Sequence, residues 1–591
     1  MTDFPERSQL PPAMADARSL VAALLVEGVR EIVLCPGSRS APLADALADA
    51  ADAGHLRLRV VLDERSAGFI ALGAARAHAL TGHSRCAAVV TTSGTAVSNL
   101  HPAVSEADAA GIPLLVISAD RPHELVGTGA SQTTEQTGLF APALRLGIDL
   151  PADLAADLGD GAADAAITGQ VRRAVVAATG ALSRDPGPVQ INARFRPPLT
   201  ADGAVPAVPT RPGPPAATAS RAAVPARALV VDDRQQAGHG SPSVGRGLVV
   251  AGDTAHPAVG ALARSLAEHL DWPLLAEPTS QARSGTQALI RYAELLGTPA
   301  GLALTERIDH LLVLGHPSLS RSVTALLGRE DLDITVLTEH ARWTDVPGRA
   351  RRIIPVDGPD QEPVDDVALQ AVRLVAALGL ERADAAWTDS WRQAVADLPD
   401  PGRFSSADAV VRAAWEASLA PDTPTLLLGS SMTVRRLDRL AQPGGAAPKA
   451  VANRGLAGID GTIATGIGLW MASGRPVRAV MGDLAFLHDA MSMSRGVREE
   501  EPDLQVIVVD DGGGAIFSHL EYAHTTPSGR FERLFTAPQC ASIAALATAL
   551  GARVHVPDDV AALRRLLAEP VDGLSVVVWE TTRHGPHAVT T

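Results

Sequence analysis

Lysine is almost absent from this chain of 591 residues, in which Lys449 is the only one. A P-loop needs a lysine between glycine and serine or threonine, so a nucleotide-binding loop of that type is excluded. An enzyme that forms a Schiff base would have to use Lys449, which lies between Pro448 and Ala450 in loop-like sequence. A surface position explains this lysine more simply, so the sequence favours neither chemistry.

Cysteine is also scarce, with Cys35, Cys86 and Cys540 the only three. None of them belongs to a CxxC or CxxH pair, so a structural zinc site is not expected. A sparse and odd number of thiols fits a reducing compartment. The first residues hold no basic start followed by an apolar run, and the run Val21–Val26 is far too short to span a membrane. We therefore expect a cytoplasmic protein.

Basic residues are outnumbered, because 51 Lys and Arg face 66 Asp and Glu and give a formal net charge of −15. A net acidic surface repels phosphate backbones and anionic lipids, so we expect neither nucleic acid nor a membrane as a partner. Apolar residues make up 46% of the chain, which is enough for a large buried core.

Short apolar runs alternate with longer helical patterns along most of the chain. Runs such as Glu31–Cys35 and Pro113–Ala119 each adjoin a helical pattern, and the rhythm returns after two proline-rich stretches. This alternation is typical of parallel strands joined by helical crossovers. We therefore predict an α/β protein with three doubly wound parallel-sheet domains. The predicted bounds are 1–196 for the N-terminal domain, 197–228 for a linker, 229–385 for a central domain and 386–591 for the C-terminal domain.

Acidic residues next to glycines follow two apolar runs of the last segment. Val477–Met481 leads into Gly482–Leu484, and Val506–Val509 leads into Asp510–Gly513. Ligands of parallel sheets gather at the carboxyl ends of strands. Magnesium prefers carboxylate and phosphate oxygens, and glycine lets the backbone approach a phosphate. A single aspartate at a strand end is as often a helix N-cap, but the pair predicts a site for a metal and a diphosphate.

These loops resemble those of thiamine-diphosphate enzymes, which carry Gly-Asp-Gly followed roughly thirty residues later by Asn-Asn. Leu484 and the run 482–489 are similar to one branch, the 2-succinyl-5-enolpyruvyl-6-hydroxy-3-cyclohexene-1-carboxylate (SEPHCHC) synthases of menaquinone biosynthesis. The resemblance implies thiamine diphosphate and Mg²⁺, or Mn²⁺, as cofactors. It implies that Asp483, the carbonyl of Gly513 and the side chain of Asp511, or of its neighbour Asp510, hold the metal. Asp511 stands where the family has asparagine, which adds a negative charge beside the diphosphate.

Further family motifs lie in the N-terminal segment, which by resemblance is the pyrimidine-binding (PYR) domain opposite a diphosphate-binding (PP) C-terminal domain. The acids of Leu62–Ser66 suit the first turn of a helix. By resemblance, Glu64 is the buried carboxylate that hydrogen-bonds the aminopyrimidine of the cofactor and shares a proton with it. A Pro-Gly turn in Cys35–Leu43 predicts that Ser38 and Arg39 are presented at the end of a strand.

The resemblance implies 2-oxoglutarate and isochorismate as substrates, which together carry four carboxylates. A surface salt bridge is the ordinary role of an arginine, but its rigid fork also binds carboxylates bidentately. An acidic protein needs a local cluster of arginines for such substrates. We therefore predict the substrate-binding residues Ser38, Arg39, Arg121, Arg321, Arg435 and Arg454. The resemblance further implies the catalytic or positioning residues Glu64, Gln132 and Ser431, and the cofactor contacts Gly482, Ile516, Phe517 and Leu520.

The implied reaction is the decarboxylation of 2-oxoglutarate and the addition of the succinyl carbanion equivalent to isochorismate, which gives SEPHCHC and CO₂. One alternative is another thiamine-diphosphate-dependent 2-oxo acid decarboxylase or ligase, similar to acetohydroxyacid synthase. That class usually binds flavin or ADP in its middle domain, where this chain has only Gly252–Thr254 after a strand. Another alternative is a binding protein that has lost turnover, but both Glu64 and Asp483 are present. The resemblance also implies a homodimer or a dimer of dimers, because PYR and PP domains of different subunits meet in this superfamily.

Overall fold

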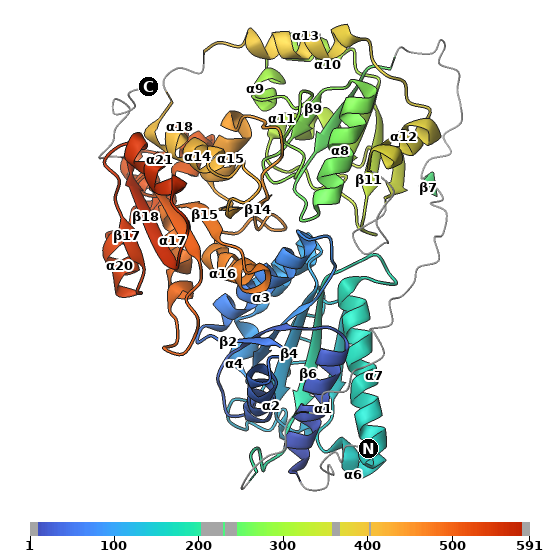
Figure 1. Ribbon diagram of the computed structural model, residues 1–591, viewed down its shortest axis with the longest axis vertical. Coiled ribbons are helices and arrows are strands. Elements are labelled where there is room, and N and C mark those ends of the chain that lie inside the picture. Colours follow the sequence, from blue (N-terminus) through green and yellow to red (C-terminus); the bar gives the residue numbers. More distant parts are fainter. Residues whose placement is uncertain are drawn as a thin grey trace.

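Three six-stranded sheets divide the computed structural model into three consecutive units (Figure 1). The structure describes residues 10–201, 208, 229–230, 245–356, 367–400 and 404–581. Most of the linker predicted at 197–228 lies outside the described residues. Within them, no helix is both long enough and apolar enough to cross a membrane.

The N-terminal unit alternates strands with helices. Its elements are α1 (Pro12–Val26), β1 (Glu31–Leu34), α2 (Ala41–Asp52), β2 (Arg57–Val60), α3 (Glu64–Ala79), β3 (Ala87–Thr91), α4 (Thr95–Ser98), α5 (His101–Ala110), β4 (Leu114–Asp120), η2 (His123–Leu125), β5 (Leu146–Leu150), α6 (Leu154–Leu158), α7 (Asp160–Thr179) and β6 (Pro188–Arg194). All strand pairs are parallel, in the order β2-β1-β3-β4-β6-β5. Every residue of β3 and β4 is buried, as expected for strands with helices on both faces of the sheet.

The C-terminal unit repeats this topology. Its elements are α14 (Ser406–Glu416), β13 (Thr425–Leu428), α15 (Met432–Leu440), β14 (Ala450–Val451), α16 (Thr462–Ser473), β15 (Val477–Gly482), α17 (Asp483–Asp489), η3 (Ala490–Met493), β16 (Leu504–Asp510), η4 (Ala515–His519), α18 (Tyr522–Thr525), α19 (Ser528–Phe531), η5 (Glu532–Thr536), α20 (Ile543–Ala549), β17 (Arg553–His555), α21 (Val560–Ala568) and β18 (Leu574–Glu580). The order β14-β13-β15-β16-β18-β17 matches that of the N-terminal sheet strand by strand. In each sheet the winding reverses between two neighbouring strands, β1 and β3 or β13 and β15, and ligands of doubly wound sheets bind beside such a reversal.

The central unit has five parallel strands and one antiparallel edge. Its elements are β7 (Leu229–Val230), β8 (Gly247–Ala251), α8 (Pro257–Leu270), β9 (Leu274–Ala276), α9 (Tyr292–Leu295), α10 (Pro299–Thr305), β10 (His310–Leu314), α11 (Arg321–Leu327), β11 (Asp333–Thr338), β12 (Arg352–Pro355), α12 (Val367–Leu378) and α13 (Ala385–Ala396). The predicted α/β fold with three doubly wound sheets is confirmed, and only the two-residue β7, antiparallel to β12, departs from the parallel pattern.

The core of the central unit includes α13. Trp387 and Trp391 of this helix are buried in that core, and the indole of Trp387 donates a hydrogen bond to the carbonyl of Gly247 at 2.9 Å. The sequence prediction began the C-terminal domain at 386, which would separate most of α13 from its packing partners. We therefore propose a boundary after Leu398, whose side chain belongs to the same core.

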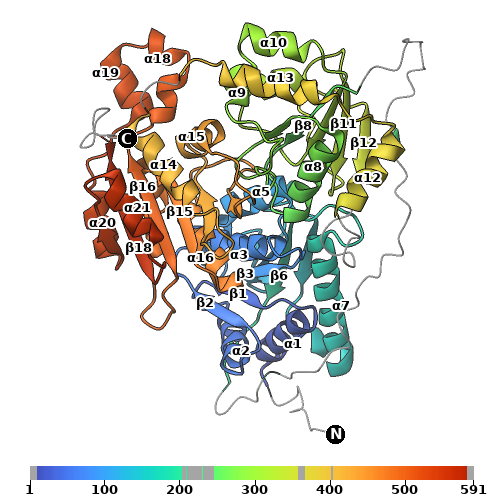
Figure 2. The same ribbon diagram turned by 45° about the horizontal axis from the view of Figure 1, so that its top comes forward.

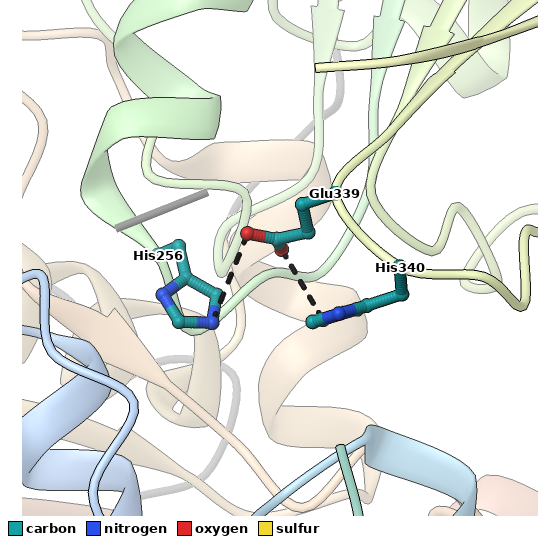
Figure 3. Close-up of side chains that lie close together, drawn as sticks. All are labelled: His256, Glu339 and His340. Atoms are coloured by element: carbon teal, nitrogen blue, oxygen red, sulfur yellow. Dashed lines mark ion pairs between the residues drawn. The ribbon is translucent and has the colours of Figure 1, made fainter. Parts of the chain in front are cut away.

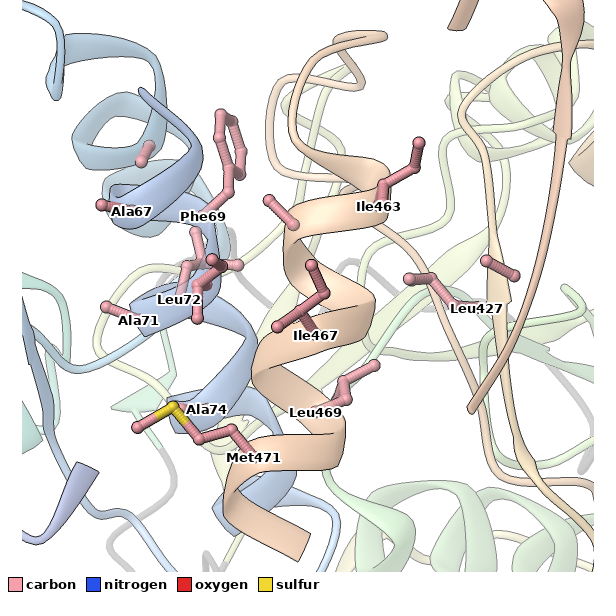
Figure 4. Close-up of a cluster of buried hydrophobic side chains, with 14 of the residues drawn as sticks. Ala67, Phe69, Ala71, Leu72, Ala74, Leu427, Ile463, Ile467, Leu469 and Met471 are labelled. Carbon is pink, nitrogen blue, oxygen red and sulfur yellow. The ribbon is translucent and has the colours of Figure 1, made fainter. Parts of the chain in front are cut away.

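The N-terminal and C-terminal units share one hydrophobic core, in which α3 lies along α16 (Figure 4). Phe69 and Leu72 of α3 and Ile467 of α16 belong to this cluster. The two backbones also approach closely, because a Cβ atom at Gly468 would lie 1.9 Å from the carbonyl oxygen of Ile70. A glycine is therefore required at this crossing, and the packing fixes how the two outer units sit in one chain.

Candidate active site

Loops that follow neighbouring strands of the C-terminal sheet meet beside its winding reversal. After β13, Ser431 is the N-cap of α15, and its hydroxyl accepts a hydrogen bond from the N–H of Thr433 at 3.2 Å. After β15, a Cβ atom at Gly482 would lie 3.9 Å from the Ser431 hydroxyl. Two of the predicted site residues, Ser431 and Gly482, thus lie next to each other although they are far apart in the sequence.

Asp483 is buried at the start of α17, with 5% of its surface exposed. Its carboxylate accepts hydrogen bonds from the N–H groups of Leu484 at 2.8 Å and Gly513 at 2.6 Å, and the second bond joins the loop after β15 to the loop after β16. Burial, and to a smaller degree the charges of Asp511 and Asp510, raise the pKa of Asp483 to about 6. A cation would relieve this crowding of carboxylates.

The backbone of Gly513 lies so close to Thr536 that a side chain would not fit at this position. Its φ is +129°, and a Cβ atom there would lie 2.3 Å from the carbonyl oxygen of Thr536. The Gly513 carbonyl accepts a hydrogen bond from the N–H of Ala515 at 2.9 Å and keeps a second lone pair. Such an oxygen is suited to a hard cation.

Asp511 is paired with an arginine that the sequence did not single out. The Nη2 atom of Arg436 on α15 lies 3.4 Å from Oδ2 of Asp511, and its Nε atom lies 3.6 Å from Asp408. The side chains of Arg436 and Asp511 are 14% and 16% exposed, so water screens the pair only weakly. The negative charge that Asp511 adds relative to asparagine is therefore offset by the neighbouring helix.

The structure also bears on the choice between Asp510 and Asp511. Asp510 accepts a hydrogen bond from the N–H of Gly512 at 3.2 Å, which is the bond of a turn-forming aspartate. The charge of Asp511 raises the pKa of Asp483 more than that of Asp510 does. This geometry favours Asp511 as the partner of Asp483.

A pair of arginines occupies the corresponding edge of the N-terminal sheet. Arg121, after β4, donates to the carbonyl of Gln132 at 2.7 Å and to the hydroxyl of Ser93, whose carbonyl accepts from the Gln132 amide at 2.9 Å. Arg39, after β1, donates to the carbonyl of Phe195 at 2.8 Å, while its buried Nε has no hydrogen-bond partner among the described residues. Burial, followed by the charge of Arg121, lowers the pKa of Arg39. Two guanidinium groups therefore repel each other at a place where an anion would be stabilised.

Glu64 is the first residue of α3 in the N-terminal unit. Its carboxylate accepts a hydrogen bond from the side-chain amide of Asn99 at 3.1 Å, while Asp63 is the N-cap of the helix. A buried carboxylate is expected at this position from the family resemblance, but Glu64 is only half-buried in the single chain and Asn99 is exposed. Ser38, which precedes Arg39, is exposed as well. Glu64 and Ser38 are thus accessible to solvent in the single chain.

A second pair of arginines lies near Ser431. Arg435 donates to the Ser431 carbonyl at 3.4 Å, and Arg454, which is 5% exposed, donates to the hydroxyl of Ser318 at 2.9 Å. Burial, followed by the charge of Arg454, lowers the pKa of Arg435. The Nε of Arg454 is buried and has no hydrogen-bond partner in the described parts of the chain. These two guanidinium groups again form a site suited to an anion.

The remaining predicted residues lie on the segment after β16 or against it. Ile516 and Phe517 lie in η4, Leu520 directly follows it, and all three are partly buried. Arg321 forms a 2.9 Å ion pair with Glu521, and the two side chains are 83% and 74% exposed. Arg321 is therefore paired at the surface, unlike the four arginines described above.

The carboxyl edges of the two outer sheets face different ends of the molecule. Figure 1 shows α6, which follows the carboxyl end of β5, at the lower end of the molecule, and α18, which follows the carboxyl end of β16, near the upper end. Figure 2 again shows α18 far from the end of the molecule that carries α1 and α2. The described hydrogen bonds of Glu64, Arg39 and Arg121 stay within the N-terminal unit, and those of Asp483 and Asp511 stay within the C-terminal unit.

Comparison with known proteins identifies both outer units. Residues 15–139 match the thiamine pyrophosphate enzyme N-terminal TPP binding domain, and residues 430–579 match the thiamine pyrophosphate enzyme C-terminal TPP binding domain. The chain is 43% identical over 578 residues to the SEPHCHC synthase of Kineococcus radiotolerans, which covers 97% of this chain and 96% of that protein. It is 40% identical to the SEPHCHC synthase of a Nocardioides species over 96% of this chain and 94% of that protein. The chain belongs to the SEPHCHC synthase family. The resemblance drawn from the sequence motifs is thereby confirmed.

The C-terminal half of the site fits the magnesium ion and diphosphate that the family implies. The fit rests on the buried carboxylate of Asp483, on the Asp511 carboxylate beside it, and on the Gly513 cradle, from which a side chain is excluded. All three groups offer the hard oxygens that Mg²⁺ prefers. The central unit lies outside both thiamine pyrophosphate matches.

Sequence reasoning about this SEPHCHC synthase family member missed Arg436 and Asn99. Arg436 adjoins Arg435 in the sequence, but the two side chains leave the helix α15 in different directions. Arg436 therefore contacts Asp511, whereas Arg435 lies near Arg454. The unusual acid at 511 was the one signal that could have prompted a search for a compensating base. Nothing in the sequence pointed to the contact between Asn99 and Glu64.

Proposed function

We propose that this chain catalyses the thiamine-diphosphate-dependent decarboxylation of 2-oxoglutarate and the transfer of the succinyl group to isochorismate. The products are SEPHCHC and CO₂, and the reaction belongs to menaquinone biosynthesis. Similarity to SEPHCHC synthases along nearly the whole chain supports this assignment. The observation in the structure that carries it is the presence of two arginine pairs, one at the carboxyl edge of each outer sheet.

The arginine pairs suit these substrates because the two substrates together bring four carboxylates to one site. Arg39 and Arg121 form one pair, Arg435 and Arg454 the other, and each pair contains a buried Nε without a hydrogen-bond partner among the described residues. A chain with a net charge of −15 repels such anions elsewhere on its surface. Local guanidinium groups therefore supply both the attraction and the bidentate geometry. Ser38, and more remotely Arg321, are proposed to extend this surface.

The cofactor is proposed to lie against the C-terminal unit. Asp483, Asp511 and the carbonyl of Gly513 would hold Mg²⁺ or Mn²⁺, and the backbone at Gly482 would leave room for the diphosphate. The side chains of Ile516, Phe517 and Leu520 would form the apolar wall beside it. Thiamine diphosphate, when bound, supplies the electron sink that decarboxylation of a 2-oxo acid requires.

The polar residues of the N-terminal unit are proposed to handle the proton and orient the substrates. Glu64 would hold a proton on its carboxylate next to the aminopyrimidine, positioned by Asn99. Gln132, whose amide is held by the Ser93 carbonyl, and Ser431 would position polar groups of the substrates. An apolar wall that excludes water protects a carbanion equivalent from premature protonation.

We also propose that the active unit is a homodimer or a dimer of dimers. No described hydrogen bond joins Glu64 to the Asp483 loop of its own chain, and we propose that the Asp483 loop of a second copy completes the site. A second copy would also bury Glu64, which is half-buried in the single chain. A two-fold axis would then create two equivalent sites. The three free cysteines, two of them buried, support a cytoplasmic location with reducing conditions.

The reaction is tested by measuring CO₂ release from 2-oxoglutarate and from pyruvate, each with and without isochorismate. We expect release from 2-oxoglutarate coupled to SEPHCHC formation, and its loss in Glu64→Gln. Activity with pyruvate alone would favour a decarboxylase or ligase of the acetohydroxyacid-synthase type instead. Full activity of Glu64→Gln with 2-oxoglutarate would contradict the role of Glu64.

The arginine assignment is tested by Arg435→Ala. Loss of one charge-assisted hydrogen-bonded contact costs about 2–3 kcal/mol, which corresponds to a drop in kcat/KM of roughly 30- to 150-fold for the substrate that this arginine binds. The matched control is Arg564→Ala, which removes a 57% exposed arginine of the same unit that pairs with Glu416. Equal kcat/KM values in both variants would exclude Arg435 from the substrate site.

A further inference from the structure

Two histidines and a glutamate of the central unit converge outside the site described above. His256 immediately precedes α8, and Glu339 and His340 follow β11 (Figure 3). Both segments lie at the carboxyl edge of the central sheet, next to a cavity of about 120 Å³. Their potential ligand atoms all lie within 4.8 Å of one another.

Two nitrogen–oxygen separations in the cluster are longer than ordinary hydrogen bonds. Nε2 of His256 lies 3.7 Å from Oε2 of Glu339, and Nε2 of His340 lies 3.5 Å from Oε1. A direct N–H···O hydrogen bond would be about 2.7–3.2 Å long. Ligands that sit about 2.0–2.2 Å from a tetrahedral Zn²⁺ lie roughly 3.3–3.6 Å from one another. The two observed separations, each to a different oxygen of Glu339, are close to those tetrahedral edges.

The burial of these side chains and the unpaired polar atoms among them also indicate a metal site. His256 is 8% exposed and the side chain of Glu339 is 10% exposed. The Oε2 atom of Glu339 has no hydrogen-bond partner in the described part of the chain, and neither does Nδ1 of His256. The hydroxyl of Thr254 accepts from the N–H of His256 at 3.1 Å and lies 3.4 Å from Oε1 of Glu339, so it braces both segments. A buried carboxylate oxygen without a donor is costly unless a cation faces it.

Two of the three arginines around the cluster are balanced by acidic neighbours. Arg342 pairs with Asp185 at 2.9 Å and Arg76 pairs with Glu106 at 3.2 Å, while the third arginine, Arg454, donates to the hydroxyl of Ser318 at 2.9 Å. Asp253 also lines the cavity and contributes a negative charge. The charges of Arg76 and Arg342 are therefore already compensated and do not prevent a divalent cation from binding.

We propose that His256, Glu339 and His340 form a binding site for a divalent transition-metal ion of the Zn²⁺ class. Two imidazoles and one carboxylate are a ligand set that zinc, cobalt and nickel accept, whereas Mg²⁺ prefers oxygen ligands alone. Three protein ligands leave the fourth position open toward the cavity, where a water molecule fits. The site is separate from Asp483 and Asp511, and the proposal stands independently of the proposed reaction.

The site lies where the three units of the chain meet. The cavity is lined by Gly111 and Ile112 after α5 of the N-terminal unit, by Arg454 of the C-terminal unit and by the central unit itself. A bound ion would fix the two central loops that face the other units. We therefore expect the ion to raise the Tm of the whole chain rather than to take part in the reaction.

The test uses the full chain, stripped with a chelator and then saturated with thiamine diphosphate and Mg²⁺ so that the active site is filled. Co²⁺ is then titrated and followed by its visible absorption, with bound metal counted by elemental analysis. We expect one Co²⁺ per chain, a higher Tm, and loss of both signals in the His256→Ala/His340→Ala double variant. His269→Ala is the matched control, because His269 lies exposed on α8, the helix that follows His256.

A second variant guards against misfolding. Glu339→Gln keeps the side-chain shape and an oxygen facing Thr254, and we expect it to weaken Co²⁺ binding about tenfold or more while the circular dichroism of the apoprotein stays unchanged. Wild-type protein that binds no more Co²⁺ than the double variant does would overturn the proposal. Loss of Co²⁺ binding in His269→Ala to the same extent would overturn it as well.

Discussion

Arg436→Met tests how the chain tolerates an aspartate at position 511. The substitution keeps a side chain of similar length and removes the guanidinium that lies 3.4 Å from Asp511 and 3.6 Å from Asp408. Removing one partner of a buried ion pair costs about 3–5 kcal/mol. Asp408 retains Arg439 at 3.1 Å and Asp511 is partly exposed. We therefore expect the free energy of unfolding to fall by about 2–3 kcal/mol when Mg²⁺ and cofactor are absent.

The measurement is urea denaturation followed by tryptophan fluorescence, because urea does not screen charges as a guanidinium salt does. Arg439→Met is the matched control: it lies on the same helix, contacts the same Asp408 and is 44% exposed, so its loss should cost at most about 1 kcal/mol. Adding Asp511→Asn to Arg436→Met should recover much of the lost stability. Equal losses for the two arginine variants, or no recovery in the double variant, would refute the reasoning.

Two further predictions concern packing and pH. Gly468→Ala places a methyl group against the carbonyl of Ile70, so we expect it to lower the free energy of unfolding by about 1–3 kcal/mol. The control Gly169→Ala should not lower it, because a Cβ atom at Gly169 has nothing within 4 Å. Urea denaturation compares the two variants. Burial raises the pKa of Glu277 from 4.5 to about 8. Between these pH values Glu277 is protonated in the folded chain but ionised in the unfolded chain. The free energy of unfolding therefore falls as pH rises, by at most about 1.4 kcal/mol per pH unit. Glu277→Gln should remove this part of the slope between about pH 6 and about pH 8, and a slope equal to that of the wild type would show that Glu277 is ionised in the folded chain.

Much of the fold could be predicted because parallel strands buried on both faces are continuous apolar runs. β4 and β16 were recognisable in this way, and the acid and glycine residues that follow strands marked the loops of the candidate site. The edge strand β17 was not predicted, since its three residues are partly exposed and carry no continuous apolar run. The same holds for β5, in which buried and exposed residues alternate.

What the sequence did not predict are contacts between distant segments. The pairing of Arg436 with Asp511 depends on the turn of α15, and the packing of α3 on α16 depends on two helices from different units. The half-burial of Glu64 has a similar origin, because the surface proposed to cover it belongs to another copy of the chain. A sequence motif indicates which functional groups a site contains, but it does not indicate which copy of the chain supplies each group.

The most direct test of the account is complementation between Glu64→Gln and Asp483→Asn. Each variant alone should be inactive in SEPHCHC formation. When the two chains are co-expressed, about half of the dimers are mixed, and each mixed dimer has one site with both original residues, so activity should return to about a quarter of the wild-type value. No recovery in demonstrably mixed dimers would contradict a site built from two copies of the chain.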